Sequence, residues 1–151
     1  MKNEPIGKHL SIAFRKYRNT LNASLREANI VLSSGQFPLL IALYKQDGVN
    51  QHSLCRMFDI DKGAVARAVD KLVRNGLIIK KIDPEDNRKS LLLLTPKARK
   101  LRGTFYSVLE EVDRRMKGNL SEEEVDTFFR IIHKIEGSLQ TAAREKTPQG
   151  R

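Results

Sequence analysis

The hydrophobic positions of the chain follow a helical period near both ends and a strand-like period in the middle. Apolar residues recur at intervals of three and four from Ile6 to Ala28, from Leu101 to Met116 and from Val125 to Leu139, which predicts amphipathic helices. Residues 77–82 and 90–94 are short apolar runs separated by a charged, turn-forming loop, which predicts a protruding hairpin. The pattern therefore predicts a mostly α fold with a small β-hairpin.

Between the two terminal regions, several residues of types that cap helices predict where further helices begin and end. Asn50 and Asp61 each precede a short helical run, and Gly76 follows the second run with the freedom that a left-handed helix end requires. Thr95 precedes Pro96, which suits the first position of a helix. We therefore expect two short helices, a hairpin and a long helix in close succession.

Two further pairs have the spacing of a capping box. Ser33 and Gln36 would open a helix before residue 37, and Ser121 and Glu124 would open the last helix. If Ser33 is the cap, Pro38 falls late in the first turn, and we expect a small local adjustment there.

The order of elements defines the expected organisation of the chain. A helix-turn-helix followed at once by a hairpin is a winged helix, and we place it at residues 33–95 of a single domain that spans 1–151. The flanking helices, at 5–30 and 96–143, carry more apolar surface than the winged helix alone would cover, which indicates a homodimer that associates through them. We expect residues 144–151 to form a flexible tail.

Composition narrows the class of protein. The chain has 151 residues, a net charge of +10, no Trp and one Cys, which fits one basic domain in a reducing compartment. It has no apolar run long enough to cross a membrane and no apolar signal core near its start, so we expect a cytoplasmic protein that does not bind membranes.

Positive charge is concentrated between Asp61 and Arg102, where twelve Lys and Arg residues stand against five Asp and Glu residues. A helix-turn-helix inserts its second helix into the major groove of DNA, and here that helix begins at Asp61. Arg67 is the exposed side chain in its first two turns that suits a bidentate contact to guanine, while Gly63 and Ala66 allow the backbone to come close. Its core-facing residues are Val65, Val69, Leu72 and Val73.

The predicted wing carries a second candidate contact. Arg88 lies at the tip of the hairpin, and an Arg held there suits the minor groove. Asp86 would pair with a neighbouring Arg and order the loop. The predicted DNA-binding residues are Lys62, Gly63, Ala66, Arg67, Lys71, Arg74, Arg88 and Lys89.

Three segments carry a family resemblance: GQFPLL, DKGAVARAVDKLVRNGLI and the wing run DPEDNRKSLLLLT. Together they resemble the MarR family of bacterial and archaeal transcription regulators. The resemblance implies an obligate homodimer with interleaved terminal helices, two winged helices on a pseudo-palindrome, and a wing Arg, here Arg88, in the minor groove. The family often has Ser or Thr where Gly63, Ala64 and Ala66 stand, and Gly where Ala98 stands, so this chain departs from it at those positions.

The resemblance also implies a small aromatic effector, held where the dimer helices meet the winged helix. The aromatic residues that would line such a site are Phe14, Tyr17, Phe37 and Phe105. All four also have the spacing of core residues, so a packing role is the alternative.

The remaining reactive residues have ordinary explanations beside functional ones. Cys55 is either an oxidant-sensing thiol or a small packed residue, and His52 either touches a phosphate or is simply exposed. His9, His52 and His133 lack metal-ligand spacing. The two consecutive Glu residues at 110–111 and the three at 122–124 suit helix ends better than acid–base catalysis. We expect no catalytic site, cofactor or metal.

The sequence therefore predicts a regulator that binds double-stranded DNA sequence-specifically, as a dimeric repressor at a pseudo-palindromic operator that a small ligand releases. The alternative is a winged-helix module that binds protein or RNA through its basic face.

Overall fold

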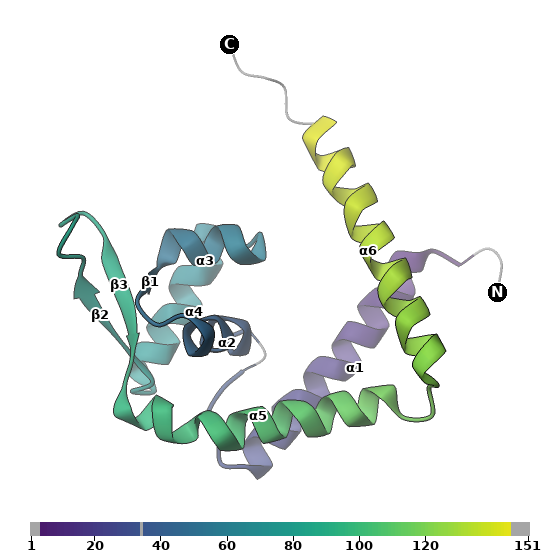
Figure 1. Ribbon diagram of the computed structural model, residues 1–151, viewed down its shortest axis with the longest axis horizontal. Coiled ribbons are helices and arrows are strands. Elements are labelled where there is room, and N and C mark those ends of the chain that lie inside the picture. Colours follow the sequence, from purple (N-terminus) through teal and green to yellow (C-terminus); the bar gives the residue numbers. More distant parts are fainter. Residues whose placement is uncertain (1–3, 34, 146–151) are drawn as a thin grey trace. The chain divides into compact units, whose positions relative to one another are not determined.

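The computed structural model describes residues 4–33 and 35–145, which form a mostly helical winged-helix fold (Figure 1). The helices are α1 (Ile6–Glu27), α2 (Phe37–Lys45), α3 (Gln51–Phe58), α4 (Lys62–Arg74), α5 (Pro96–Lys117) and α6 (Glu122–Glu145). The strands are β1 (Val49–Asn50), β2 (Ile78–Ile82) and β3 (Ser90–Leu94). The predicted elements are therefore present in the predicted order.

Side-chain caps begin the helices of the helix-turn-helix as expected. The Asn50 Oδ1 atom accepts a hydrogen bond from the Ser53 amide at 2.9 Å, and the Asp61 Oδ1 atom accepts one from the Ala64 amide at 2.8 Å. Each carboxyl or amide oxygen satisfies a backbone N–H group that has no partner within its helix. Gly76, with φ +67°, then ends the turn after α4.

The start of α2 differs from the prediction. Ser33 and Gln36 do form the expected pair, because the Ser33 amide donates to Gln36 Oε1 at 2.9 Å, but they form it in a turn that precedes the helix. The helix begins at Phe37, with Gln36 as its cap, so Pro38 is its second residue. An N–H group at that position has no intrahelical partner, so proline fits there and the expected adjustment is unnecessary.

The sheet has one strand more than the predicted hairpin. The strand order is β1-β3-β2, and both pairings are antiparallel. Val49 lies opposite Leu92, and Ile78 lies opposite Leu94. A strand of two residues is too short to show an alternating pattern, so no hydrophobic periodicity indicates β1.

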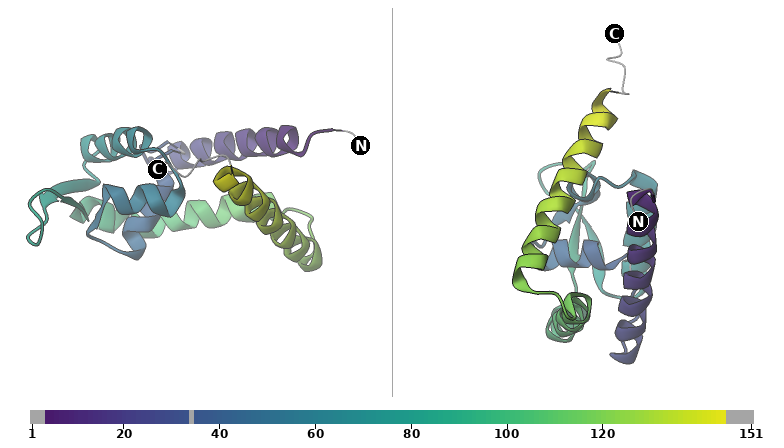
Figure 2. Two further views of the ribbon diagram at one scale, coloured as in Figure 1. Left: turned by 90° about the horizontal axis from the view of Figure 1, so that it is seen from above. Right: turned by 90° about the vertical axis from the view of Figure 1, so that its right-hand side faces the viewer.

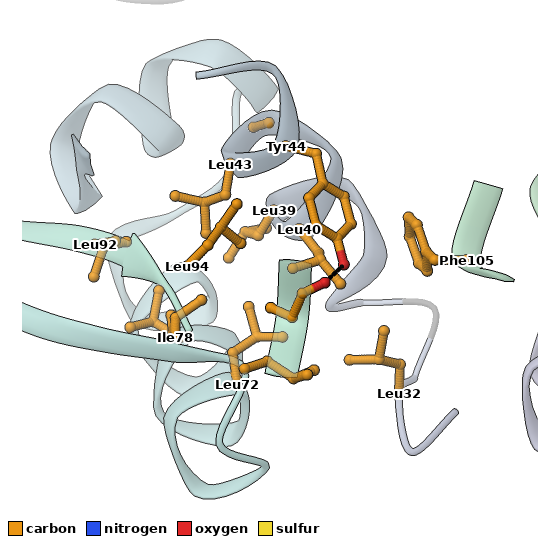
Figure 3. Packing of buried hydrophobic residues seen from close by; sticks show 14 of the residues in the cluster. Leu32, Leu39, Leu40, Leu43, Tyr44, Leu72, Ile78, Leu92, Leu94 and Phe105 are labelled. Atoms are coloured by element: carbon orange, nitrogen blue, oxygen red, sulfur yellow. Dashed lines mark hydrogen bonds between the residues drawn. The ribbon is translucent and has the colours of Figure 1, made fainter. Parts of the chain in front are cut away.

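The core lies where α2, α4, α5 and the sheet meet (Figure 3). Leu40, Leu72 and Leu92 are fully buried there, and the hydroxyl of Tyr44 donates a hydrogen bond to the Ala98 carbonyl at 2.6 Å. Burial raises the pKa of Tyr44 to about 12, so this hydroxyl remains a donor at neutral pH. One predicted core residue is wrong: Val73, at the edge of the apolar face of α4, is 37% exposed.

The chain divides into two compact units, with the boundary after Asp113. The second unit contains the end of α5 and α6, where Ser121 and Glu124 form the expected reciprocal capping box. Helix α6 continues to Glu145, so the first two residues of the expected flexible tail are helical, and the remaining residues of that tail lie outside the described part of the chain.

Candidate nucleic-acid interface

Helix α4 has one buried face and one charged face. Val65, Val69 and Leu72 are at most 1% exposed, and the helix contacts α3 and β2. The opposite face carries the predicted DNA-binding residues of this helix, of which only Ala66 is partly buried. The exposed ones are Lys62, Gly63, Arg67, Lys71 and Arg74.

Gly63 leaves room for the Arg67 side chain at the start of α4. A Cβ atom on Gly63 would lie 3.3 Å from Arg67 Nη1 and 3.1 Å from the capping Asp61 Oδ1, which is tighter than ordinary contact distances. The guanidinium group therefore lies over the helix N-terminus, in space that a side chain at residue 63 would restrict. Gly63 thus influences where Arg67 presents its donors.

The loop between β2 and β3 forms the wing and projects beyond α3 and α4 (Figure 2). Asp86 Oδ1 accepts a hydrogen bond from the Arg88 amide at 3.0 Å, and Asp86 Oδ2 pairs with Lys89 Nζ at 3.0 Å. The hydrogen bond from Lys89, and then that from the Arg88 amide, lower the pKa of Asp86. Asp86 orders the loop as expected, but its cationic partner is Lys89 and not an Arg, because the tight turn brings residue 89 back over residue 86.

A second ion pair joins the wing to α4. Lys80 Nζ, on β2, lies 2.8 Å from Asp70 Oδ1, and this hydrogen bond lowers the pKa of Asp70. Both side chains are about half exposed, so the pair contributes little to stability. It does connect the two elements that the sequence assigned to DNA.

Three of the four cations at the start of α5 have partners within the protein. Lys97 Nζ donates to the Asn75 carbonyl at 2.8 Å, and Arg99 pairs with Asp47. The Arg102 guanidinium lies 5.8 Å from the ring centres of both Tyr44 and Tyr106. All three contribute to the excess of positive charge between Asp61 and Arg102, although they are not among the predicted DNA-binding residues, because a count of charges does not show which cations have internal partners.

The cations of α4 and the wing tip differ in this respect. Within residues 4–33 and 35–145, Lys62, Arg67, Lys71, Arg74 and Arg88 form no ion pair. Their charge is therefore available to a polyanion. Lys89 is the exception among the predicted cations, because Asp86 holds it and raises its pKa.

The four aromatic residues proposed for an effector site do not form one group. Phe14, Tyr17 and Phe37 lie in succession, with ring centres 6.4 and 6.2 Å apart. Phe105 is fully buried and packs against Tyr44, 5.6 Å away. Phe105 is thus a core residue, which was the alternative for all four.

The other reactive residues give no sign of a second site. Cys55 is half-buried against the core, His9 Nε2 lies 2.7 Å from Glu4 Oε2, and His133 stacks on Phe129. No group of three or more potential metal ligands occurs in the part of the chain that the structure describes. Among the same residues, no helix is long and apolar enough to cross a membrane.

Comparison with known proteins places this geometry in a family. The MarR family model matches residues 32–90. The HTH-type transcriptional regulator BilQ from Clostridium symbiosum is 31% identical over 104 residues, which cover 69% of this chain and 72% of BilQ. The chain belongs to the MarR family. This confirms the family resemblance, and it confirms a transcriptional regulator in place of an enzyme, since the curated relatives are named as regulators.

Solved structures of MarR-family proteins confirm the fold. The MarR transcriptional regulator from Methanosarcina mazei is 30% identical, with a TM-score of 0.78 over 90% of this chain and 97% of that chain. A MarR-family regulator from Listeria monocytogenes, solved in complex with 26mer DNA, has a TM-score of 0.80 at 22% identity and covers 98% of this chain and 99% of its own. This MarR-family protein therefore has the predicted winged-helix architecture.

Proposed function

We propose that this MarR-family protein binds a pseudo-palindromic DNA operator as a homodimer and represses transcription by occluding a promoter. The observation that carries the proposal is the set of exposed cations on α4 and at the wing tip that form no ion pair within the described residues: Lys62, Arg67, Lys71, Arg74 and Arg88. A regulator of this kind acts on the chromosome, in the cytoplasm.

Each predicted DNA-binding residue has a role in this arrangement. Arg67 would contact a guanine edge in the major groove, and Arg88 would enter the adjacent minor groove. Gly63 and Ala66 allow the backbone of α4 to approach the bases, while Lys89 holds the wing loop through Asp86. The remaining cations, Lys62, Lys71 and Arg74, would bind phosphates and add to affinity without adding base preference.

Exposed apolar side chains on the long helices support the dimer. Ile6 and Phe14 on α1 are 63% and 60% exposed, and Phe128 and Leu139 on α6 are 52% and 64% exposed. Exposed apolar faces of this kind are typical of association surfaces. A two-fold dimer would set the two copies of α4 about 34 Å apart, which is one turn of DNA.

The aromatic group of Phe14, Tyr17 and Phe37 supports a small aromatic effector. Phe14 is exposed while Tyr17 and Phe37 are half-buried, so the group offers ring faces at the edge of the core. A flat ligand would stack there, and its binding would favour a state in which the two copies of α4 have the wrong spacing.

Selection from a random duplex library, followed by fluorescence anisotropy, tests the proposal. We expect a two-fold-symmetric motif and an affinity that falls steeply as salt rises. Arg67→Ala should relax preference at one base position in each half-site, because it removes the bidentate donor. If the wild-type protein selects no motif, it is a winged-helix module for protein or RNA; if the variant selects the wild-type motif, Arg67 contacts only phosphate.

A further inference from the structure

The C-terminal end of α4 is hydrogen-bonded to two other segments: the connection that follows α1 and the start of α5. Asn75, the cap residue of α4, donates from Nδ2 to the Val31 carbonyl at 2.6 Å, across 44 residues of sequence. Val31 lies in the connection between α1 and α2. The cap residue of α4 therefore also holds the connection between α1 and α2.

The same end of α4 is bound to the start of α5. The Asn75 carbonyl accepts from Lys97 Nζ at 2.8 Å, and the Gly76 carbonyl accepts from the Thr95 hydroxyl at 2.7 Å. Thr95 also caps α5, since the Ala98 amide donates to its hydroxyl at 3.2 Å. We call the contacts of Asn75 with Val31 and Lys97 the Asn75 clamp.

Apolar packing does not replace the clamp at this point. The Val31 side chain is 77% exposed, although its neighbours Ile30 and Leu32 are buried in the core. Asn75 and Val31 both line a surface hollow of about 540 Å³ and a second of about 440 Å³. The connection is anchored through its neighbours, but between Val31 and α4 the direct link is a hydrogen bond.

We infer that Asn75 is a positioning residue that fixes the direction of α4 relative to α1 and α5, and thereby the half-site spacing that the dimer accepts. The inference rests on the proposed dimeric binding of an operator. Direction matters because inserting one base pair moves the next half-site by about 3.4 Å and rotates it by roughly 35° around the duplex. If α4 were free to tilt, it would adjust to the shifted and rotated half-site. If the clamp holds α4 in one direction, it would not adjust, and binding to the altered spacing would be weaker.

The test compares the selected operator with the same operator carrying one inserted base pair between its half-sites. We expect the wild-type protein to prefer the native spacing strongly. Asn75→Ala should weaken binding to the native spacing about five- to tenfold, the effect of one lost hydrogen bond, and change binding to the inserted site less than twofold. The ratio of the two affinities should therefore fall.

Arg74→Ala is the matched control, because it removes a neighbouring exposed cation that is outside the clamp. It should weaken binding to both operators by the same factor and leave their ratio unchanged. Asn75→Asp is the second variant, because it keeps the shape of the side chain and removes the Nδ2 donor. It should therefore lower the ratio of the two operator affinities as Asn75→Ala does. Its added negative charge should weaken binding to both operators by the same factor and leave the ratio unaffected. Thermal melting of each variant confirms that it is folded.

The outcomes separate the inference from the function on which it rests. An unchanged ratio in both Asn75 variants, with a wild-type protein that discriminates, overturns the positioning role alone. An equal loss on both operators does the same, because it assigns Asn75 a general effect on affinity. A wild-type protein without spacing preference overturns the proposed dimeric function, and the inference with it.

Discussion

Two sets of cations lie close together in the sequence and differ in what they bind. Among the described residues, the cations of α4 and Arg88 of the wing tip are exposed and form no ion pair. Lys97, Arg99 and Arg102 at the start of α5 instead bind a backbone carbonyl, a carboxylate and two aromatic rings, respectively. The first set is available to DNA. The second set holds α5 against the winged helix.

The difference shows why formal charge overestimates a DNA-binding surface. A cation with an internal carboxylate partner contributes almost no net field, and moving it to a phosphate would sacrifice the existing contact. The contacts therefore divide the cations of residues 61–102 into those with partners inside the protein and those that form no ion pair among the described residues; we propose that the latter bind DNA. The following predictions test that division, from the largest expected effect to the smallest.

Arg88→Ala should reduce operator affinity by about 1–3 kcal/mol, because it removes a minor-groove contact from a loop that Asp86 still orders. Arg99→Ala is the matched comparison: it removes the same charge from a residue that Asp47 already neutralises, so its operator affinity should stay within about twofold of the wild-type value. Fluorescence anisotropy at fixed salt measures both. Equal losses for the two variants would mean that total charge, and not its location, governs binding.

Asp47→Ala should lower the free energy of unfolding by about 1–2 kcal/mol and leave operator affinity unchanged. Asp47 Oδ1 accepts from the Leu94 amide at 2.8 Å and the Gly48 amide at 3.1 Å, and its carboxylate also binds Arg99. Urea denaturation gives the stability. A loss of operator affinity measured without denaturant, where the variant is fully folded, would show that the Asp47–Arg99 pair contributes to DNA binding.

Tyr44→Phe should cost about 1 kcal/mol at neutral pH, because the buried Ala98 carbonyl loses its donor. The pKa of Tyr44 is raised from 10.0 to about 12 by burial, so the protonated hydroxyl stabilises the fold below pH 10 and that stability is lost as pH rises toward 12. The variant should therefore lose less stability than the wild-type protein over this alkaline range. Melting curves at pH 9 and 11 measure the difference, and parallel losses in both proteins would contradict it.

Local signals in the sequence predicted most of the fold. The caps at Asn50 and Asp61, the left-handed Gly76 and the capping box at Ser121 act over three or four residues, and each lies where the pattern placed it. Exposed and buried faces of α4 also followed from spacing. Two residues at the boundary between the faces differ from the prediction: Val73 is 37% exposed and Ala66 is partly buried.

Features that depend on distant partners could not be predicted in this way. Gly76 was visible as a helix end, but the bond from the preceding Asn75 to Val31 joins residues 44 positions apart, and no local pattern encodes it. The same holds for Arg99 with Asp47 and for the separation of Phe105 from Phe14, Tyr17 and Phe37. Sequence placed the candidate site on α4 and the wing, and tertiary contacts determine which of the nearby cations have internal partners.

Gly63 makes the exposed face of α4 sensitive to a single substitution. Any larger residue there would press on both the Arg67 guanidinium and the capping carboxylate of Asp61, so one substitution would shift the Arg67 side chain and alter the start of the helix together. If Arg67 contacts a base as proposed, such a substitution would change the position from which it does so, and in a Gly63→Ala variant the better helix-forming tendency of alanine would offset part of the strain.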